Sequence, residues 1–284
     1  MKEITINWHI IQKCNYKCYY CFAKYEKSKR KEIHYSKKEI EILLNKIYKT
    51  FNSNYKDYDI RLNIAGGEPT LSKNLGFIIE TAYRIGFNVS IITNSSILTT
   101  MFIKSYAKYL SMFAISIDSI NRDNNIKIGR VQKEKSHEIS QVFRNIELLR
   151  NFNKDLKIKI NTVVNKHNYN EYLGNFINLI KPDKWKIFQA LSINSDEIHC
   201  NEAQYKTFLQ NHKDLKVSTF TESNDEMIDS YIMIDPHGRF YQNTNGTYTY
   251  SKSILDITEN EIAKCFNVDM NKYNERYEEN NYAK

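Results

Sequence analysis

Six strand-like segments, separated by segments with a helical pattern, most constrain what this chain can fold into. The strand-like segments lie near residues 4–11, 58–65, 88–94, 112–118, 156–163 and 184–189. The helical patterns lie near residues 37–51, 73–86, 98–109, 134–152 and 170–180, and the first begins with the capping-box pair Ser36 and Glu39. Helices between successive strands favour parallel neighbours. We therefore expect an α/β fold with a parallel sheet, open or curled into a partial barrel.

The strand-like segments also have a polar face. In the first one, Thr5, Asn7 and His9 alternate with apolar residues. Because strand side chains alternate between two faces, helices would cover the apolar stripe and the polar stripe would line a cavity. An antiparallel sheet with one wet face has the same period, but the intervening helices argue against it. The polar positions of the other strands are Arg61, Asn63, Ser116, Asp118, Lys157, Lys159, Asn161, Lys184 and Lys186.

Several cations fall on this polar face and would converge in the cavity. Buried cations that lack carboxylate partners are costly, so the cavity is expected to receive a multiply charged anion. A triphosphate fits best. The cations concerned are Arg61, Lys159, Lys184 and Lys186.

The alternation of strands and helices is expected to stop after residue 190. A helix near residues 202–213, short strands around 229–242 and a helix near 258–266 resemble a covering extension. We see no linker that would make this extension independent. The predicted division is therefore a partial barrel over residues 1–190 and an extension over 191–284 that packs on it and closes the substrate site.

Three cysteines, Cys14, Cys18 and Cys21, follow the first strand with the spacing C-x3-C-x2-C. Structural zinc usually takes four protein ligands. Three thiolates on one loop instead suit a 4Fe–4S cluster that leaves one iron open. The alternative is a zinc knuckle completed by Cys200, Cys265 or a histidine; otherwise we read Cys200, Cys265, His199 and His237 as bystanders.

The cysteine count and the hydropathy suggest a compartment. Five cysteines, a start without a secretory leader and the lack of any apolar run of membrane-spanning length favour a soluble protein of the reducing cytoplasm, where clustered cysteines bind metals. The net charge is +8, but lysines are spread among many carboxylates and only Lys27–Lys31 is densely basic. A solvated surface explains this better than a nucleic-acid site.

The strand that ends at Ala65 continues into Gly66, Gly67, Glu68 and Pro69. The glycines permit close backbone approach, and Glu68 can accept a hydrogen bond from an ammonium group. Ligands of α/β folds bind at the carboxyl ends of the strands. Hydrogen-bonding residues end the next two strands at the same edge, namely Thr93, Asn94, Ser95, Ser116, Asp118 and Ser119.

The cysteine spacing together with this Gly-Gly-Glu-Pro segment resembles the radical S-adenosylmethionine superfamily, whose fold is a partial (β/α)6 barrel. More narrowly, the chain resembles the viperin family of antiviral nucleotide dehydratases, and in particular its prokaryotic members. The blocks that carry this resemblance span nearly the whole chain and are Gln12–Cys18, Ala114–Ser119, Ile128–Arg130, Lys159–Asn161, Trp185–Gln189, Glu222–Asn224, Asp229–Tyr231 and Ser251–Asp256.

The resemblance implies a 4Fe–4S cluster on Cys14, Cys18 and Cys21, with S-adenosylmethionine chelated by the open iron. It also implies reduction by a reductase, flavodoxin or ferredoxin, and cleavage of the cofactor to a 5′-deoxyadenosyl radical. The positions that would contact S-adenosylmethionine are Gly66, Gly67, Glu68, Thr93, Asn94, Ser116 and Arg130.

The resemblance also assigns substrate contacts. Lys159, Asn161 and Lys186 match the family, Arg61 replaces a lysine, and Lys184 replaces an arginine of animal members, which costs the bidentate fork but keeps the charge. Asn7 and Asn63 complete the expected substrate-binding set. Tyr231 matches a family tyrosine suspected of a catalytic role.

The implied reaction removes water from a nucleoside triphosphate, giving a 3′-deoxy-3′,4′-didehydro nucleotide that terminates chain extension. The base stays open, because prokaryotic members differ among CTP, UTP and GTP; CTP is our first choice, then UTP or GTP. Residues 243–250 are uncharged where animal members have a basic loop, a difference that bears on base selection if the loop closes over the substrate. We expect a monomer without nucleic-acid or membrane partners. The alternatives are a radical enzyme acting on a peptide or another small molecule, and a zinc-stabilised nucleic-acid-binding protein.

Overall fold

One ten-stranded sheet organises the chain in the computed structural model, which describes residues 2–133, 135, 138–190, 199–244, 247–266 and 268–275. The order across the sheet is β10-β9-β8-β1-β2-β3-β4-β5-β6-β7. The strands are β1 (Lys2–His9), β2 (Tyr58–Ala65), β3 (Asn88–Thr93), β4 (Met112–Ser116), β5 (Lys157–Val164), β6 (Lys184–Gln189), β7 (Thr219–Glu222), β8 (Ile232–Ile234), β9 (Arg239–Gln242) and β10 (Thr249–Ser253).

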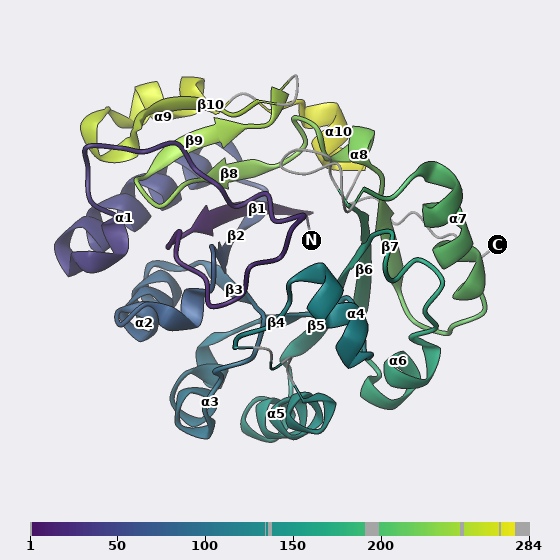
Figure 1. Cartoon of the computed structure of the whole chain (residues 1–284). Helices are drawn as coiled ribbons and strands as arrows, with labels where there is room; N and C mark the ends of the chain where they lie inside the picture. Colours follow the sequence, from purple (N-terminus) through teal and green to yellow (C-terminus); the bar gives the residue numbers. More distant parts are fainter. Residues whose placement is uncertain are drawn as a thin grey trace.

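The sheet is parallel from β8 through β7 and curls into a partial barrel. Every neighbouring pair in that stretch is parallel, while β9 and β10 are added antiparallel beyond β8. The expected α/β fold with an unclosed parallel sheet is therefore confirmed. Figure 1 shows six helices in an arc outside the curl, namely α1 (Lys37–Asn54), α2 (Leu75–Ile85), α3 (Thr100–Tyr106), α5 (Ile139–Phe152), α6 (Gly174–Ile180) and α7 (Glu202–Asn211).

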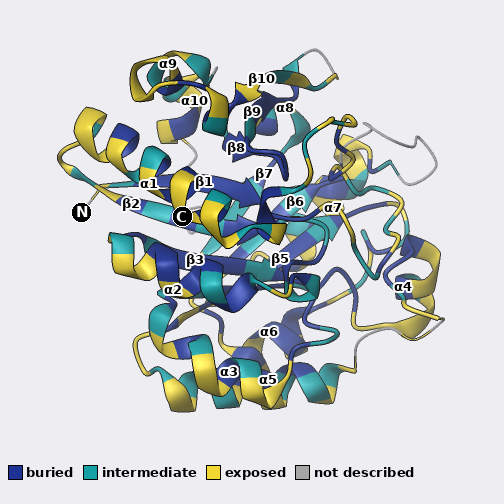
Figure 2. Ribbon diagram, turned by 90° about the vertical axis from the view of Figure 1, so that its left-hand side faces the viewer, coloured by how far each residue is buried: buried dark blue, intermediate teal, exposed yellow. Residues whose placement is uncertain are grey.

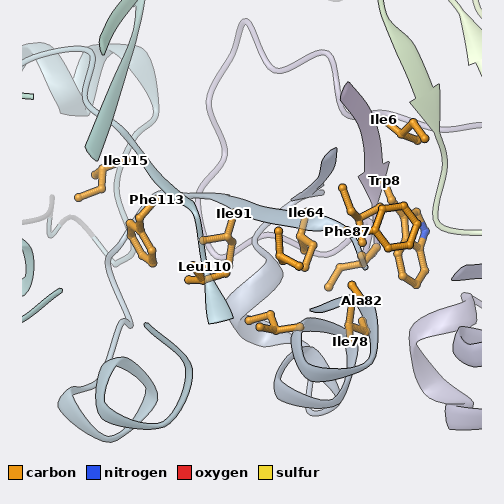
Figure 3. Close-up of a cluster of buried hydrophobic side chains, with 14 of the residues drawn as sticks. Ile6, Trp8, Ile64, Ile78, Ala82, Phe87, Ile91, Leu110, Phe113 and Ile115 are labelled. Atoms are coloured by element: carbon orange, nitrogen blue, oxygen red, sulfur yellow. The ribbon is translucent and has the colours of Figure 1, made fainter. Parts of the chain in front are cut away.

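The apolar stripes of the strands pack against these helices. Ile6 and Trp8 of β1 and Ile64 of β2 are fully buried. Figure 3 shows Trp8 and Ile64 near Ile78 and Ala82 of α2, with Ile6 farther along β1, in a layer that continues to β3 and β4. Figure 2 shows the consequence: the strands are buried, and the outer faces of the helices are exposed. Burial of one stripe against the helices leaves the other stripe for the interior of the curl.

Local signals explain where the first helix begins. The Ser36 side chain accepts a hydrogen bond from the Glu39 amide, as the cap predicted. The reciprocal half of the expected capping box is not formed, because the Glu39 carboxylate pairs with Arg30 at 2.9 Å. The cap is therefore present without the box.

Two elements differ from the sequence expectations. A helix not expected from the sequence, α4 (Arg122–Ile128), lies between β4 and α5; the Asn121 side chain caps its start and Gly129, at φ 81°, ends it. The helix expected over residues 134–152 begins only at Ile139. The alternation also continues past residue 190, because α7 leads to β7, which pairs parallel with β6.

Strands beyond residue 190 thus join both edges of the parallel stretch: β7 extends the β6 edge and β8 extends the β1 edge. The connection from β7 to β8 is short and contains α8 (Asn224–Met227), and the helices α9 (Glu259–Cys265) and α10 (Met270–Glu275) follow β10. The division of the chain at residue 190 stays a prediction. Among the described residues, no helix combines the length and the apolar character needed to cross a membrane.

Candidate active site

A cavity of about 270 Å³ lies inside the curl of the sheet. Its wall combines the loop after β1 with the ends of several strands and with residues next to β8 and β9. The polar stripe does line it, as predicted from the alternation: Asn7 and His9 of β1, Ser116 of β4 and Asn161 of β5 all face the cavity. The site is therefore at the strand edge where α/β folds bind ligands.

The side of the cavity formed by Cys14–Cys21, Gly66–Glu68 and Arg130, here called the cysteine wall, is held by backbone contacts. The amides of Gly67 and Glu68 donate to the carbonyls of Ile11 and Lys13, at 2.7 and 3.0 Å. The Lys17 amide donates to the Gly129 carbonyl at 3.1 Å. The cysteine loop is thus clamped between the turn after β2 and the end of α4.

Glycine is required at both clamps. A Cβ on Gly67 would lie 2.3 Å from the Lys13 carbonyl oxygen, and one on Gly129 would lie 2.3 Å from the Lys17 carbonyl oxygen. Both neighbours are backbone atoms, so neither can move aside without displacing the cysteine loop.

The three thiols of this loop suit a cluster better than a single ion. Cys14, Cys18 and Cys21 all line the cavity. Structural zinc usually takes four protein ligands, whereas three thiolates suit a cluster that keeps one iron open. Cys200 is fully buried elsewhere, next to the start of α7.

Electrostatics and hydrogen bonds agree with a cluster. Burial raises the pKa of Cys14 and Cys21, and raises the pKa of Cys18 to about 12. Such thiols become thiolates when a metal supplies positive charge. The Tyr16 amide and the Asn94 side-chain amide lie 3.3 and 3.9 Å from the Cys14 sulfur, as donors to it. The residues present therefore fit a 4Fe–4S cluster with three protein ligands.

Glu68 is fully buried beside the cluster loop. Burial raises the pKa of its carboxyl group, and hydrogen bonds oppose that rise. Its Oε1 accepts from the Thr93 hydroxyl at 2.7 Å and from the Thr70 amide and hydroxyl; its Oε2 accepts from the Asn94 amide at 2.8 Å. The second oxygen thus keeps a lone pair for an ammonium donor.

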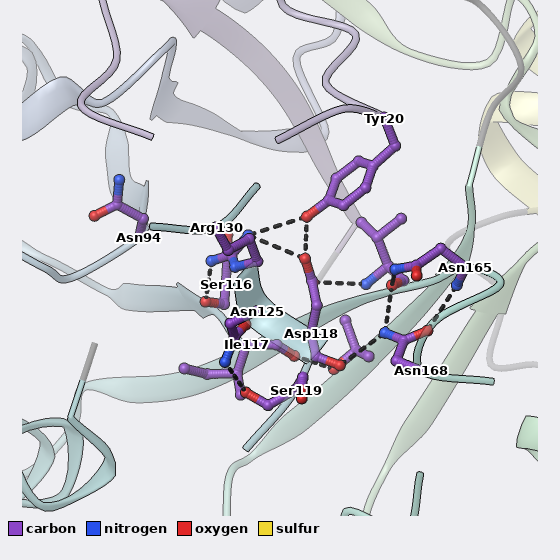
Figure 4. Close-up of polar contacts among 12 residues, drawn as sticks. Tyr20, Asn94, Ser116, Ile117, Asp118, Ser119, Asn125, Arg130, Asn165 and Asn168 are labelled. Atoms are coloured by element: carbon purple, nitrogen blue, oxygen red, sulfur yellow. Dashed lines mark hydrogen bonds and ion pairs between the residues drawn. The ribbon is translucent and has the colours of Figure 1, made fainter. Parts of the chain in front are cut away.

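Arg130 forms a buried ion pair with Asp118 at 3.1 Å and donates to the Ser116 carbonyl at 2.6 Å (Figure 4). The Tyr20 hydroxyl donates to the same carboxylate, and the Val163 amide donates to its other oxygen at 2.9 Å. The Arg130 Nε is buried without a partner among the described residues. The guanidinium is therefore held in place with one donor unused at the cavity, which fits a bound carboxylate or hydroxyl group.

A second group of residues, here called the lysine wall, consists of Asn161 and Tyr231, which line the cavity, and of Lys186 and Glu222, which contact Tyr231 but are not in the lining. Lys186 of β6 forms an ion pair with Glu222 at the end of β7, and its Nζ donates to the Tyr231 hydroxyl at 3.1 Å. The Tyr231 hydroxyl donates to Glu222. Because Tyr231 directly precedes β8, these contacts bridge the two edges of the parallel stretch.

These pairs correct the expectation that the interior cations lack carboxylate partners. Arg61 pairs with Glu3 at 2.6 Å and donates to the Ser111 hydroxyl, and Lys186 pairs with Glu222. Lys184 is exposed, with its Nζ 5.1 Å from the centre of the Phe220 ring. The inference of an anionic ligand from unpaired buried cations therefore fails for Arg61 and Lys186.

The cavity brings together most of the residues singled out from the sequence. The three cysteines, the cofactor positions, Asn7, Asn161 and Tyr231 all line it. The others stand outside its wall: Asn63 donates to the Asn7 side chain at 2.7 Å, and Lys159 lies beside Lys184 in the register of β5 and β6. Those outside the wall are Arg61, Asn63, Lys159, Lys184 and Lys186.

Sequence reasoning placed Asp118 and His9 on the polar stripe but gave neither a role in the site, and it gave Glu222 none. The period of the strand put Asp118 on the same face as Ser116, but did not indicate that it would pair with Arg130. Glu222 carried no local signal of its role, because its partners lie on other strands. His9 lines the cavity with its Nδ1 buried and unpartnered among the described residues, and burial lowers its pKa to about 3. Its ring packs edge-on against Phe22, Tyr25 and Tyr241.

These features define a radical S-adenosylmethionine enzyme: a partial barrel whose cluster loop lies beside a buried carboxylate and a buried arginine in the lining of one cavity. The family model described as Radical SAM superfamily matches residues 8–180. The solved structure of anSMEcpe with bound AdoMet and Kp18Cys peptide superposes with a TM-score of 0.71, at 16% identity over 96% of this chain and 82% of that chain. That likeness concerns the fold. Enzymes of this superfamily use a 4Fe–4S cluster and S-adenosylmethionine.

Relatives of similar length narrow the family. A protein of Psychrobacter lutiphocae named S-adenosylmethionine-dependent nucleotide dehydratase is 36% identical over 97% of this chain and 95% of its own length. A protein of a Fibrobacter species with the same name is 37% identical over 100% of this chain and 90% of its own. The chain therefore belongs to the S-adenosylmethionine-dependent nucleotide dehydratase family, the viperin family.

Proposed function

We propose that this enzyme removes water from a nucleoside triphosphate, with CTP preferred over UTP and GTP, and forms a 3′-deoxy-3′,4′-didehydro nucleotide. The observation that carries the proposal is the cavity itself, whose lining combines the cluster cysteines with the Asn161 and Tyr231 side chains, and Tyr231 contacts Lys186. The product lacks a 3′-hydroxyl group, so a polymerase that incorporates it cannot extend the chain. An antiviral role against phage follows from that chemistry.

The cysteine wall holds the cofactor in this proposal. When bound, the cluster and S-adenosylmethionine supply a 5′-deoxyadenosyl radical that abstracts the hydrogen at the ribose 4′ carbon. Glu68 would accept from the amino group of the bound cofactor, and Arg130 would donate its unused Nε to a carboxylate or hydroxyl oxygen. Asp118 keeps Arg130 in position, and the surrounding apolar side chains exclude water.

The lysine wall holds the nucleotide. Asn161 is buried and its Oδ1 has no partner among the described residues, so it can accept from a ribose hydroxyl. Lys186 lies beside Asn161 in the strand register, and Lys159 beside Lys184 one position earlier on the same stripe. A triphosphate would compete with Glu222 for Lys186. Tyr231 then gains freedom to donate to the substrate, which is the catalytic role we propose for it.

We assign selection of the nucleobase to the segment at residues 243–250. Asn243 and Tyr248 line the cavity, and residues 245 and 246 lie outside the described residues. The Tyr248 hydroxyl donates to the Phe22 carbonyl at 2.8 Å, which ties this segment to the cysteine loop. Neutral amide and hydroxyl groups suit the polar edge of a pyrimidine. We further propose that the enzyme acts as a monomer and receives two electrons per turnover from a flavodoxin, a ferredoxin or a reductase. One electron serves cleavage of the cofactor, and the other reduces the nucleotide radical when its 3′-hydroxyl group leaves with a proton as water.

Anaerobic turnover of the reconstituted enzyme with each of CTP, UTP, GTP and ATP tests the proposal. Mass spectrometry should find a nucleotide lighter by one water, formed with 5′-deoxyadenosine, and most rapidly from CTP. Equal and slow cofactor cleavage with every nucleotide, without a dehydrated product, would refute the substrate class. Faster product formation from GTP would refute only the preference.

A further inference from the structure

The loop that carries the cluster cysteines also holds most of the chain's excess positive charge. Residues 12–31 contain seven lysine or arginine side chains and one acid, a surplus of six, whereas the whole chain has a net charge of +8. Arg30 pairs with Glu39 and Asp256. The six lysines are all exposed. We call them the basic rim: Lys13, Lys17, Lys24, Lys27, Lys29 and Lys31.

The basic rim is not part of the substrate site. None of its six lysines is among the described residues that line the cavity. The one acid of the segment, Glu26, is itself exposed and lies 4.0 Å from Arg239. The charge therefore points outward, where unscreened cations attract an anionic partner.

The second half of the loop is fixed against the sheet, so the rim has a defined surface. The Glu26 amide donates to the Tyr250 hydroxyl at 3.0 Å, and Arg239 donates to the Glu26 carbonyl at 3.0 Å. Figure 1 shows the loop between β1 and α1, in purple, running beside β9 and β10. Lys29 and Lys252 of β10 line one shallow hollow of the surface.

Exposed aromatic side chains lie within the same loop. Tyr19 is 54% exposed and Phe22 is 37% exposed, and both flank the cluster cysteines. An aromatic centre with a charged rim is the usual anatomy of a specific protein interface. Lys24 is three residues from Cys21, so its Cα lies within about 11 Å of the Cα of that ligand. A partner seated here would be next to the cluster.

We propose that the basic rim, with the exposed Tyr19 and Phe22 of the same loop, is the docking surface for an acidic one-electron carrier of the flavodoxin or ferredoxin type. In the step it serves, the reduced carrier loses one electron and the cluster gains it. The inference rests on the proposed function, because radical cleavage needs an external electron. An acidic protein fits better than nucleic acid, since the patch is centred on the loop where that electron must enter.

The test compares two triple charge reversals in the holoenzyme. The first variant alters the rim and combines Lys24→Glu, Lys27→Glu and Lys29→Glu. The second variant makes the same change of charge at exposed positions on α1, on α3 and after α5, and combines Lys38→Glu, Lys104→Glu and Lys154→Glu. The dissociation constant of a bacterial flavodoxin and of a ferredoxin is measured at two salt concentrations. Cluster reduction is followed by visible absorbance, with the carrier and separately with dithionite.

The rim reversal should raise the dissociation constant at least about tenfold and remove most of its salt dependence, because steering charges are lost. Reduction by dithionite should not change, and the control reversal should stay near wild type. Equal affinity of the two triple variants, or no salt-dependent binding of either carrier to wild type, would overturn the proposal. Salt-dependent binding of a single-stranded oligonucleotide in place of the carriers would indicate a nucleic-acid surface instead. No nucleotide substrate is used in this test. Its result can therefore be interpreted even if the dehydratase assignment is wrong.

Discussion

The two walls of the cavity are built in different ways. The cysteine wall is fixed by backbone hydrogen bonds and by glycines that admit no side chain, at Gly67 and Gly129. Apart from Tyr231, the lysine wall is carried by the paired strands β5, β6 and β7, and its charged and hydroxyl groups are joined to one another by side-chain contacts, through the network of Lys186, Glu222 and Tyr231. Backbone clamps hold one geometry, whereas a side-chain network can exchange partners when a ligand arrives.

Because the two walls are built differently, substitutions in them should affect different steps of the reaction. Changes in the cysteine wall should abolish cleavage of S-adenosylmethionine whether or not a nucleotide is present. Changes in the lysine wall should spare that cleavage and affect only the nucleotide. The comparison would be contradicted by a lysine-wall variant that abolishes cofactor cleavage, or by a cysteine-wall variant that spares it.

The largest effect is expected for Cys18→Ala. Removal of one of three ligands should prevent assembly of the cluster, and cofactor cleavage should fall to background. Iron and sulfide analysis with the visible spectrum measures this. Cys265→Ser is the control and should retain the full iron content, because Cys265 lies on α9, away from the cavity. Full iron in the Cys18 variant would contradict the assignment.

Gly129→Ala should lower cofactor cleavage by about 100-fold, because a displacement of about 1 Å is enough to misalign reacting groups. The matched control is Gly86→Ala, which also replaces a glycine at positive φ but meets the Tyr48 hydroxyl instead of backbone. Both variants should lose about 1 kcal/mol of stability from the left-handed conformation. Equal cleavage by the two variants would show that the clamp is not needed.

Lys186→Gln should raise KM for the nucleotide by about 30-fold, since a hydrogen bond to a charged group contributes about 2 kcal/mol. The exposed Lys184→Gln should change KM by about threefold or less, because exposed ion pairs are weak. Steady-state kinetics at saturating S-adenosylmethionine gives both values. A larger increase in KM for Lys184→Gln than for Lys186→Gln would indicate that the triphosphate binds near Lys184 instead.

Tyr231→Phe should slow product formation roughly tenfold, as expected for one lost hydrogen bond, and leave cofactor cleavage near wild type. Single-turnover assays that follow both products separate the two steps. Unchanged nucleotide turnover would show that this hydroxyl has no catalytic role. Tyr231 would then serve only to connect β7 and β8.

The smallest effect concerns His9, which lies between the walls. Its folded pKa of about 3 is below the usual value of 6.5, so its stabilising contribution is complete above pH 6.5 and is lost as the pH falls toward 3. Between pH 7.5 and 5.5 the loss should be about 1.4 kcal/mol, one pKa unit. Denaturant unfolding of wild type and His9→Gln measures it. Parallel losses in the two proteins would assign the acid sensitivity to other groups.

Much of the fold and of the cysteine wall could be predicted because their signals are local. The period of two along the strands placed Asn7, Ser116 and Asn161 on one face, and the structure puts them on one cavity. The cysteine spacing and the glycines are consecutive motifs, so no tertiary information was needed to identify them.

Asn161, Lys186 and Tyr231 of the lysine wall were singled out from the sequence, but the pairing of its side chains could not be predicted in the same way. Lys186 and Glu222 are far apart in the chain and meet only through the register of β6 and β7, and Arg61 meets Glu3 through β1 and β2. A single sequence contains no signal of such pairs, so the cations were wrongly expected to lack partners. The helix α4 was missed for another reason: its seven residues are too few for a clear period, although Asn121 and Gly129 mark its ends.

The most direct measurement is turnover with CTP deuterated at the ribose 4′ carbon. If the two walls hold cofactor and nucleotide against each other, one deuterium appears in 5′-deoxyadenosine and the dehydrated nucleotide carries none. 5′-Deoxyadenosine without deuterium, formed at the same rate as the dehydrated product, would contradict hydrogen abstraction at that carbon and with it the arrangement of the site proposed for this enzyme.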